Sequence, residues 1–174
     1  NENRDTIYEV VKRTSKKCFV PLTVGGGVRT VEDINNLLLA GADKVSINTA
    51  AVKNPNFIKE VAEKFGSSTI TISVEVIKSN NGKYLVYTDS GREFTGLELT
   101  KWLQTIQNYG AGEIVLTLVD SEGTGKGFDF DLLKKINNKI SIPFIVHGGI
   151  GSESDVLEAC KLDSINGVCI SSIF

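Results

Sequence analysis

The chain has 174 residues, a hydrophobic fraction of 41% and a formal net charge of −2 at pH 7. This length and composition predict one soluble globular domain. The small charge and the lack of a dense basic cluster argue against nucleic acid as a partner, and the apolar runs are far shorter than the roughly 20 residues of a membrane span. No segment resembles a signal peptide, so we expect a cytoplasmic protein that does not bind membranes.

The pattern of apolar residues predicts alternating helices and strands, which is typical of stacked βα units around a parallel sheet. Near 77–92 the turn signal Asn80-Asn81-Gly82 interrupts this alternation and predicts a small hairpin insertion. In chain order the elements outside the hairpin are a helix over 4–16, a strand over 18–24, a helix over 31–40, a strand over 43–48, a helix over 55–64, a strand over 69–76, a helix over 96–109, a strand over 112–117, a helix over 129–138, a strand over 142–147, a helix over 153–161 and a strand over 166–171.

The cysteines and the lone histidine predict neither a disulfide framework nor a metal site. Cys18, Cys160 and Cys169 are odd in number and lack the spacing of metal ligands, and His147 is the only histidine. The apolar neighbours of the cysteines predict buried free thiols in a reducing compartment. We therefore expect no metal and no cofactor.

One segment of the chain occurs twice. Pro21–Val28 is an apolar run that ends in glycines, and Pro143–Ile150 repeats it in the same context, between a predicted strand and a predicted helix. Glycines at such a turn let backbone N–H groups approach an anion, and the start of the helix adds partial positive charge. A single turn of this kind is a weak signal, because glycine also serves tight turning. Two copies in matching context predict two related phosphate sites.

The duplication favours a (β/α)₈ barrel over an open doubly wound sheet. A barrel can contain two similar halves, each with its own phosphate turn, but it needs eight strands and typically about 250 residues. The sequence supplies six strands outside the hairpin. We therefore expect residues 1–174 to form a single partial barrel domain, truncated at both ends.

Side chains alternate between the two faces of each predicted strand. In the strand over 69–76, Thr71, Ser73 and Glu75 share one face and aliphatic residues occupy the other. Helices pack on the aliphatic face, so the polar face should point into the barrel. Bulky aliphatic residues normally fill that interior. The polar interior predicts either a functional passage or a few polar groups satisfied by buried water.

Several polar residues stand where predicted strands end, which is where barrel enzymes carry catalytic groups. Glu75 predicts a proton-transferring carboxylate, although a solvated glutamate at the rim explains the position equally well. Asn48 and Thr49 follow the strand beside the first glycine turn and predict contacts to the same phosphate. His147 lies within the second turn, where it either donates to a ligand or makes structural hydrogen bonds. The long glycine-rich loop Asp120–Gly127 predicts a substrate loop, with a mobile connector as the alternative.

With these segments the chain resembles the cyclase subunit of imidazole glycerol phosphate synthase, a barrel of the histidine biosynthesis family. The likeness covers nearly the whole chain, and the stretch that contains Ser46-Ile47-Asn48-Thr49 favours the cyclase over the sister isomerase. The matching stretches are 21–36, Gly41–Pro55, Thr95-Gly96, Gly110–Asp129 and the second glycine turn.

The resemblance implies a lyase that works with a glutaminase subunit as an amidotransferase. Ammonia from the glutaminase would enter the bottom of the barrel and travel through its interior to the top. There it would attack a small-molecule bis-phosphate substrate and give imidazole glycerol phosphate and aminoimidazole carboxamide ribotide. The two phosphates of this substrate match the two glycine turns.

The resemblance also implies roles for single residues. Lys44 and Glu113 match part of a charged gate at the ammonia entrance, and Glu75 takes the position of one catalytic carboxylate. One phosphate would be held by Gly27, Asn48 and Thr49, and the other by Gly148, Gly149 and Ser172. Further substrate contacts would come from Thr117, Glu122 and Gly123.

The chain departs from the family pattern at its carboxylates. The family uses two catalytic aspartates, and the one on the first barrel strand has no counterpart in this sequence. Glu75 stands at the second position and moves the carboxylate by one methylene; an error of about 1 Å can lower a rate about a hundredfold. Glu122 likewise replaces an aspartate. We expect an isolated chain of this length to be an inefficient cyclase.

Two other functions fit the sequence. A diverged paralogue that channels ammonia to another amidation, such as surface-sugar synthesis, would keep Lys44 and Glu113 while its carboxylates change. An inactive phosphate-binding partial barrel would instead self-associate through exposed sheet edges.

Overall fold

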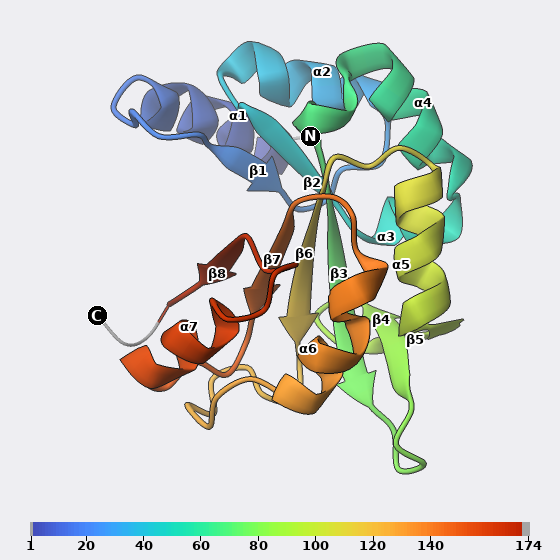
Figure 1. Ribbon diagram of the computed structural model, residues 1–174. Helices are drawn as coiled ribbons and strands as arrows, with labels where there is room; N and C mark the ends of the chain where they lie inside the picture. The colour runs from blue at the N-terminus through green and yellow to red at the C-terminus, as the bar shows by residue number, and fades with distance from the viewer. Residues whose placement is uncertain (1, 172–174) are drawn as a thin grey trace.

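The computed structural model describes residues 2–171, with side chains described from residue 7 onward. Helices and strands alternate through most of these residues (Figure 1). The α-helices are α1 (Glu2–Ser15), α2 (Val31–Ala40), α3 (Thr49–Lys53), α4 (Asn56–Phe65), α5 (Leu99–Asn108), α6 (Phe130–Ile136) and α7 (Glu153–Ala159), and two short 3₁₀ helices are η1 (Ser67–Thr69) and η2 (Asn137–Lys139). The strands are β1 (Thr23–Gly25), β2 (Lys44–Ile47), β3 (Ile70–Lys78), β4 (Tyr84–Thr88), β5 (Glu93–Glu98), β6 (Glu113–Leu118), β7 (Phe144–His147) and β8 (Gly167–Cys169).

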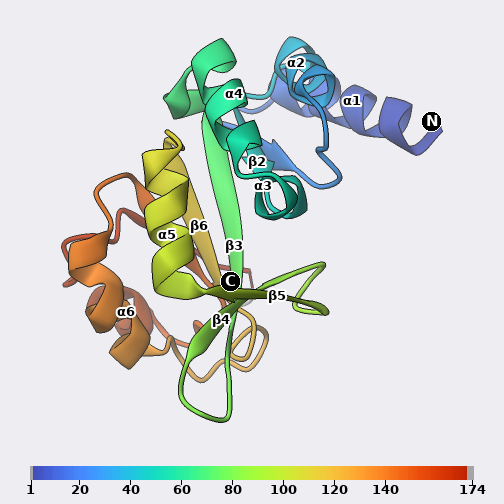
Figure 2. The ribbon, with the colours of Figure 1, turned by 90° about the vertical axis from the view of Figure 1, so that its right-hand side faces the viewer.

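The eight strands that the structure describes belong to one sheet. Six of them are parallel neighbours in the order β1-β2-β3-β6-β7-β8, so β1 and β8 are the two edges. β4 pairs antiparallel with the far end of β3, and β5 pairs with β4. Figure 2 shows this hairpin at the lower end of β3, beneath α5. Parallel strands joined by helices in this order form an incomplete (β/α)₈ barrel, which confirms the expected fold class.

The two faces of the sheet differ as the sequence predicts. On β3, Ile70, Ile72 and Val74 are completely buried. On the other face Ser73 and Glu75 are partly exposed, and Thr71 is buried where it donates to Glu113. Figures 1 and 2 show α4, α5 and α6 together on one side of β3. The aliphatic face packs there in the hydrophobic core. The polar face is thus the inner face of the partial barrel.

The helices that cover the aliphatic face of the sheet carry apolar residues at helical spacing. In α4 these are Phe57, Ile58 and Val61, and in α5 Trp102 and Ile106 belong to the same core. A stripe of residues three and four apart lies on one side of a helix, and its burial against the sheet holds the helix in place. None of the helices among the described residues is long and apolar enough to cross a membrane.

The first strand is shorter than the sequence predicts. β1 covers Thr23–Gly25 instead of 18–24. Phe19 is 95% exposed, Val20 is also exposed, and Pro21 has no N–H to donate to a neighbouring strand. The apolar character of this segment therefore does not indicate a buried strand.

Two elements were not expected from the sequence. Residues 93–98, part of which was predicted to begin a helix, form β5 against β4, so α5 begins only at Leu99. α3 forms directly after β2, where no helix was predicted. Both differences lie at the carboxyl end of the sheet and reshape the surroundings of Glu75.

The cysteines are free thiols, but the prediction that they are buried is wrong. Cys18 is partly exposed, and Cys160 and Cys169 are exposed. Cys160 follows the last residue of α7, and Cys169 ends the edge strand β8, so neither has a packed layer on both sides. Apolar neighbours in sequence do not ensure burial at such positions.

Candidate active site

The carboxyl end of the sheet brings three polar residues to one level. Glu75 on β3 pairs in register with Thr117 on β6, which pairs with His147 on β7. All three alternate with buried aliphatic residues and so belong to the inner face. This end of a barrel is where enzymes of the fold hold their substrates. Glu75, the carboxylate that the sequence predicts for proton transfer, therefore lies in a suitable place.

Two N–H donors hold the side chain of Glu75. Asn48 Nδ2 donates to Oε1 at 3.0 Å, and the backbone N–H of Gly91 donates to Oε2 at 2.8 Å. An ionised carboxylate only accepts hydrogen bonds, so the amide of Asn48 turns Nδ2 toward Glu75 and leaves Oδ1 for another partner. Asn48 Oδ1 is buried without a hydrogen-bond partner among the described residues. A ligand N–H or O–H group at this point would satisfy it.

Both glycine turns have a backbone that favours glycine. The angle φ is 102° at Gly26 and 69° at Gly27, and 97° at Gly148 and 108° at Gly149. These values lie in the region that residues with a Cβ atom rarely adopt. The turns differ in their surroundings, because nothing lies within 4 Å of a Cβ built at Gly26 or Gly27, whereas Gly148 and Gly149 are crowded by neighbouring backbone.

Each turn is tied to the helix after it by one aspartate. Asp33 Oδ2 accepts hydrogen bonds from the N–H groups of Arg29 and Thr30, both at 2.9 Å. Asp155 Oδ2 makes the same pair of bonds at the start of α7, with Gly151 at 3.0 Å and the next residue at 2.9 Å. These bonds, that from Gly151 above all, hold the pKa of Asp155 below its ordinary value. The sequence repeat thus extends to the hydrogen bonds that open the two helices.

A small pocket lies at the second glycine turn. Its lining includes Glu122 and Gly123 from the loop, His147 at the end of β7, and Gly148 and Gly149 from the turn. All of these except His147 are predicted substrate contacts. The loop rests directly on the turn, since the Gly127 N–H donates to the Gly149 carbonyl at 2.6 Å. Ser172, the remaining predicted contact at this turn, lies outside the described residues.

The residues predicted for the other phosphate lie at the ends of β1 and β2. Gly25 pairs in register with Ser46, so Gly27 and Asn48 follow these neighbouring parallel strands on the same side of the sheet. Thr49 is the first residue of α3 and stands next to Asn48. The backbone therefore places the three predicted contacts at adjacent strand ends.

The opposite end of the sheet holds a charged cluster. Lys44 Nζ lies 2.5 Å from Glu113 Oε2, and Thr71 Oγ1 donates to Glu113 Oε1 at 2.8 Å. The Glu113 side chain is only 9% exposed, and that of Lys44 is 28% exposed. Four residues separate Glu113 from Thr117 along β6, which corresponds to about 13 Å. The predicted gate residues thus meet at the amino end of the strands, while Glu75 lies at the carboxyl end.

The chain is similar to known proteins over its whole length. The sequence profile of the family described as "Histidine biosynthesis protein" matches residues 1–174. Three curated relatives bear the name imidazole glycerol phosphate synthase subunit HisF. The protein of Legionella pneumophila is 49% identical over 148 residues, which are 85% of this chain and 70% of that protein. Those of Alkaliphilus metalliredigens and Streptococcus gordonii are 44% and 43% identical over all 174 residues, and the match covers 69% of each.

The chain belongs to the histidine biosynthesis protein family. The resemblance to its cyclase branch noted from the sequence is confirmed by the HisF relatives.

In this histidine biosynthesis protein the hairpin contacts the chain at the start of the loop Asp120–Gly127 and just beyond its end. The Lys78 N–H donates to Asp120 Oδ2 at 2.7 Å, and the Tyr84 hydroxyl donates to Asp129 Oδ2 at 2.6 Å. Partial burial acts to raise the pKa of Asp129, but the hydrogen bonds from Tyr84 and the Leu132 N–H, together with the charge of Lys78, outweigh it and leave this pKa below its ordinary value. Burial, helped by Asp129, raises the pKa of Tyr84.

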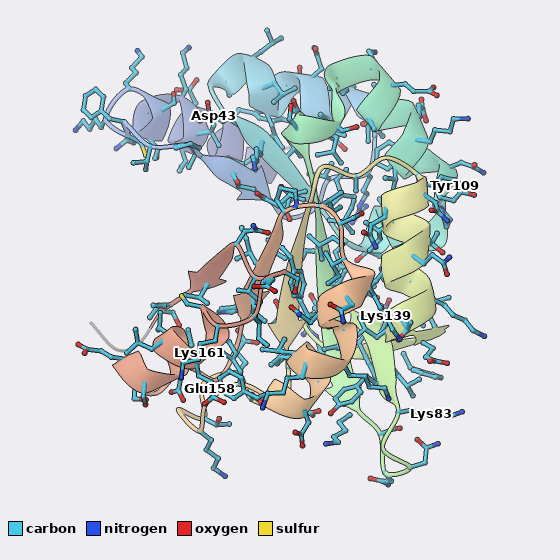
Figure 3. All side chains as sticks on the ribbon, in the orientation of Figure 1. Asp43, Lys83, Tyr109, Lys139, Glu158 and Lys161 are labelled. Atoms are coloured by element: carbon cyan, nitrogen blue, oxygen red, sulfur yellow. The ribbon has the colours of Figure 1, made fainter. Side chains whose placement is uncertain are left out.

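A second hollow of about 530 Å³, larger than the pocket at the second glycine turn, lies on another part of the protein surface. It is lined by residues of α4 and of the loop after α5, among them Lys59, Glu63 and Tyr109, the last labelled in Figure 3. This loop leads into the amino end of β6, so the hollow is remote from the glycine turns. Lys59 and Glu63 already pair with each other at 3.8 Å. The smaller pocket at the second turn therefore remains the candidate site.

One residue that contacts the candidate site was not expected from the sequence. Gly91 was only part of an expected hairpin, but its N–H contacts Glu75 across the sheet. The turn residues Asp89-Ser90-Gly91 were a readable signal for a tight turn. Nothing in the sequence pattern indicated where that turn would point.

Proposed function

We propose that the chain catalyses the cyclase reaction of imidazole glycerol phosphate synthase in histidine biosynthesis. In this reaction ammonia and a substrate with two phosphates give imidazole glycerol phosphate and aminoimidazole carboxamide ribotide. Family membership supports the reaction class. The carboxylate of Glu75, held at the carboxyl end of the sheet by two N–H donors, is the observation that carries the proposal.

Glu75 would act as the acid–base group at the reacting centre. Attack by ammonia and closure of an imidazole ring require that protons leave the attacking nitrogen and reach the departing oxygen. A carboxylate fixed within hydrogen-bond reach is suited to such transfers, which contribute about 10²–10⁴-fold to a rate. The unpartnered Oδ1 of Asn48 beside it would accept from a donor group of the substrate.

The two glycine turns would bind the ends of the substrate. They follow β1 and β7, on either side of the strands that carry Asn48, Glu75 and Thr117. A ligand with an anionic group at each end would therefore span the inner face and place its centre near Glu75. The pocket formed by Gly123 and Gly149 supports this assignment for the second phosphate.

A glutaminase subunit is the proposed source of ammonia. The cluster of Lys44, Glu113 and Thr71 lies at the amino end of the strands, away from the substrate end. Ammonia delivered there would pass small polar side chains of the inner face, including Ser73, before it reaches Glu75. The cluster would regulate this entrance by exchanging its hydrogen bonds.

Turnover with an ammonium salt in place of the glutaminase tests the proposal. The protein is incubated with the bis-phosphate substrate, and both products are quantified by chromatography. In line with the low efficiency expected of this chain, we expect slow, ammonia-dependent formation of the two products in equal amounts. Glu75→Gln cannot exchange a proton at this position and should lower this rate by at least a further hundredfold. A purified glutaminase with glutamine should replace the ammonium salt. Product formation unchanged in Glu75→Gln would refute the role of this carboxylate, and no turnover by the unaltered protein would refute the proposed cyclase activity of this chain.

A further inference from the structure

The turn between β4 and β5 reaches back to the end of β3. The Gly91 N–H donates to Glu75 Oε2 at 2.8 Å, whereas the other oxygen receives Asn48 Nδ2 at 3.0 Å. Each oxygen of the carboxylate thus has a donor of its own, one from the end of β2 and one from the hairpin. Two donors on opposite oxygens fix both the position and the plane of a carboxylate. Without Gly91 the carboxylate would keep only the Asn48 contact and would be able to rotate about it.

The backbone of this turn is unusual. Asp89 and Ser90 have φ angles of 56° and 59°, and they are the only non-glycine residues with positive φ within residues 2–171. Gly91 follows with φ 78°. Arg92 closes the turn, because its Nε donates to the Asp89 carbonyl at 2.8 Å and its Nη2 lies 3.1 Å from Asp89 Oδ1. Strained backbone of this kind persists where the surrounding structure demands one position, and it is concentrated at functional sites.

Gly91 also contacts the chain that leads into the substrate loop. A Cβ at this residue would lie 2.7 Å from Cγ1 of Val119, the residue that follows β6. No real Cβ approaches another atom that closely, so a side chain at Gly91 would push the turn away from both Val119 and Glu75. The position therefore requires glycine for its φ angle and for its packing.

We infer that the turn Asp89–Arg92 is a positioning element for Glu75, and that its Gly91 N–H sets the carboxylate in the orientation used for proton transfer. This inference rests on the proposed function, since it assigns the hairpin a part in that reaction. Gly91 touches the acid–base group and not the reacting atoms, so it is a positioning residue. The hairpin is thereby a working part of the site.

The contact itself can be tested without any turnover. In ¹⁵N-labelled protein, the amide proton of Gly91 should resonate at low field because it donates to a carboxylate. Replacing that acceptor with a neutral amide in Glu75→Gln should move this resonance upfield. The amide of Gly82, which donates to the Ser79 carbonyl in the other turn of the hairpin, is the control and should keep its position. An unchanged Gly91 amide resonance in Glu75→Gln would overturn the contact.

The positioning role requires a matched pair of glycine variants. Gly82 lies in the other turn of the same hairpin, has φ 77°, and has nothing within 4 Å of a built Cβ. Its neighbour Lys83, labelled in Figure 3, lies at the outer end of the hairpin. Gly82→Ala thus introduces the same backbone strain as Gly91→Ala without the clash. It serves as the control for any general loss of stability.

We expect Gly91→Ala to lower kcat about ten- to a hundredfold with KM changed less than twofold, because a misplaced acid–base group affects only the chemical step. Gly82→Ala should leave both constants within twofold of the parent. Adding Val119→Ala to Gly91→Ala removes the clash and should restore part of kcat. Equal kcat values for the two glycine variants, or a rise in KM at constant kcat, would overturn the positioning role. A parent without turnover would refute the proposed function, and the Gly91 amide resonance would then decide on the contact alone.

Discussion

Removing the Lys44 ammonium group should destabilise the protein, because the buried Glu113 carboxylate would lose its charged partner. Glu113 is 9% exposed, and its two oxygens are occupied by Lys44 and Thr71. Removing one partner of a fully buried ion pair costs about 3–5 kcal/mol. Lys44 is 28% exposed, so water reaches part of the vacated site, and we expect Lys44→Met to lower the free energy of unfolding by about 2 kcal/mol.

A double-mutant cycle separates this interaction from general effects of substitution. Glu113→Gln in the Lys44→Met background removes the unpaired charge, so the double variant should be more stable than Lys44→Met alone. We expect a coupling free energy of about 1–2 kcal/mol from urea unfolding of the four proteins. The exposed pair of Lys59 and Glu63, at 3.8 Å, provides the control and should couple by less than about 0.5 kcal/mol. Equal coupling for the two pairs would refute the reasoning from burial.

Two further expectations concern the loop over the second glycine turn. In Gly151→Ala the new Cβ would lie 1.9 Å from the Gly125 carbonyl oxygen, so the loop would have to move. Binding of the bis-phosphate substrate, measured by calorimetry, should therefore weaken at least tenfold. An unchanged affinity would contradict this. Asp129 has a pKa below its ordinary 3.8, so its stabilising contribution is complete above that pH and is lost as the pH falls through the folded-state value. Asp129→Asn should therefore lower the free energy of unfolding by about 1–2 kcal/mol at pH 7. The variant should also lose less of its free energy of unfolding than the parent between pH 7 and pH 3, as measured by urea unfolding. Parallel curves of stability against pH would contradict the assignment.

The sequence was sufficient for features that depend on local periodicity. Alternating residues such as Ile72 and Ser73 reveal the two faces of a strand, because each face has a different environment. The two glycine turns could be predicted because the backbone there requires glycine, and because a polar segment that begins a helix follows each of them. The position of Glu75 at a strand end followed from the same alternation.

Features that depend on distant pairing were not predictable. β5 contains Gly96 and charged residues, and its strand conformation comes from pairing with β4. The hydrogen bond from Gly91 to Glu75 joins the turn between β4 and β5 to the end of β3. It depends on how the hairpin twists, and no preference of a single residue determines that twist. Cys169 has apolar neighbours, but it ends an edge strand and is exposed. Each miss reflects tertiary structure overriding a local preference.

If the two glycine turns bind the substrate as proposed, their unequal surroundings would give its capture a direction. Space beside Gly26 is open, whereas the Gly127 carbonyl lies 2.4 Å from a Cβ built at Gly149. For a ligand with two anionic ends, the open turn would favour the first encounter, and the second end would be seated against a loop that is hydrogen-bonded to its turn. The first contact would govern how fast such a molecule associates, and the second how long it stays. The two copies of one sequence element would in this way control different rates of the same binding reaction.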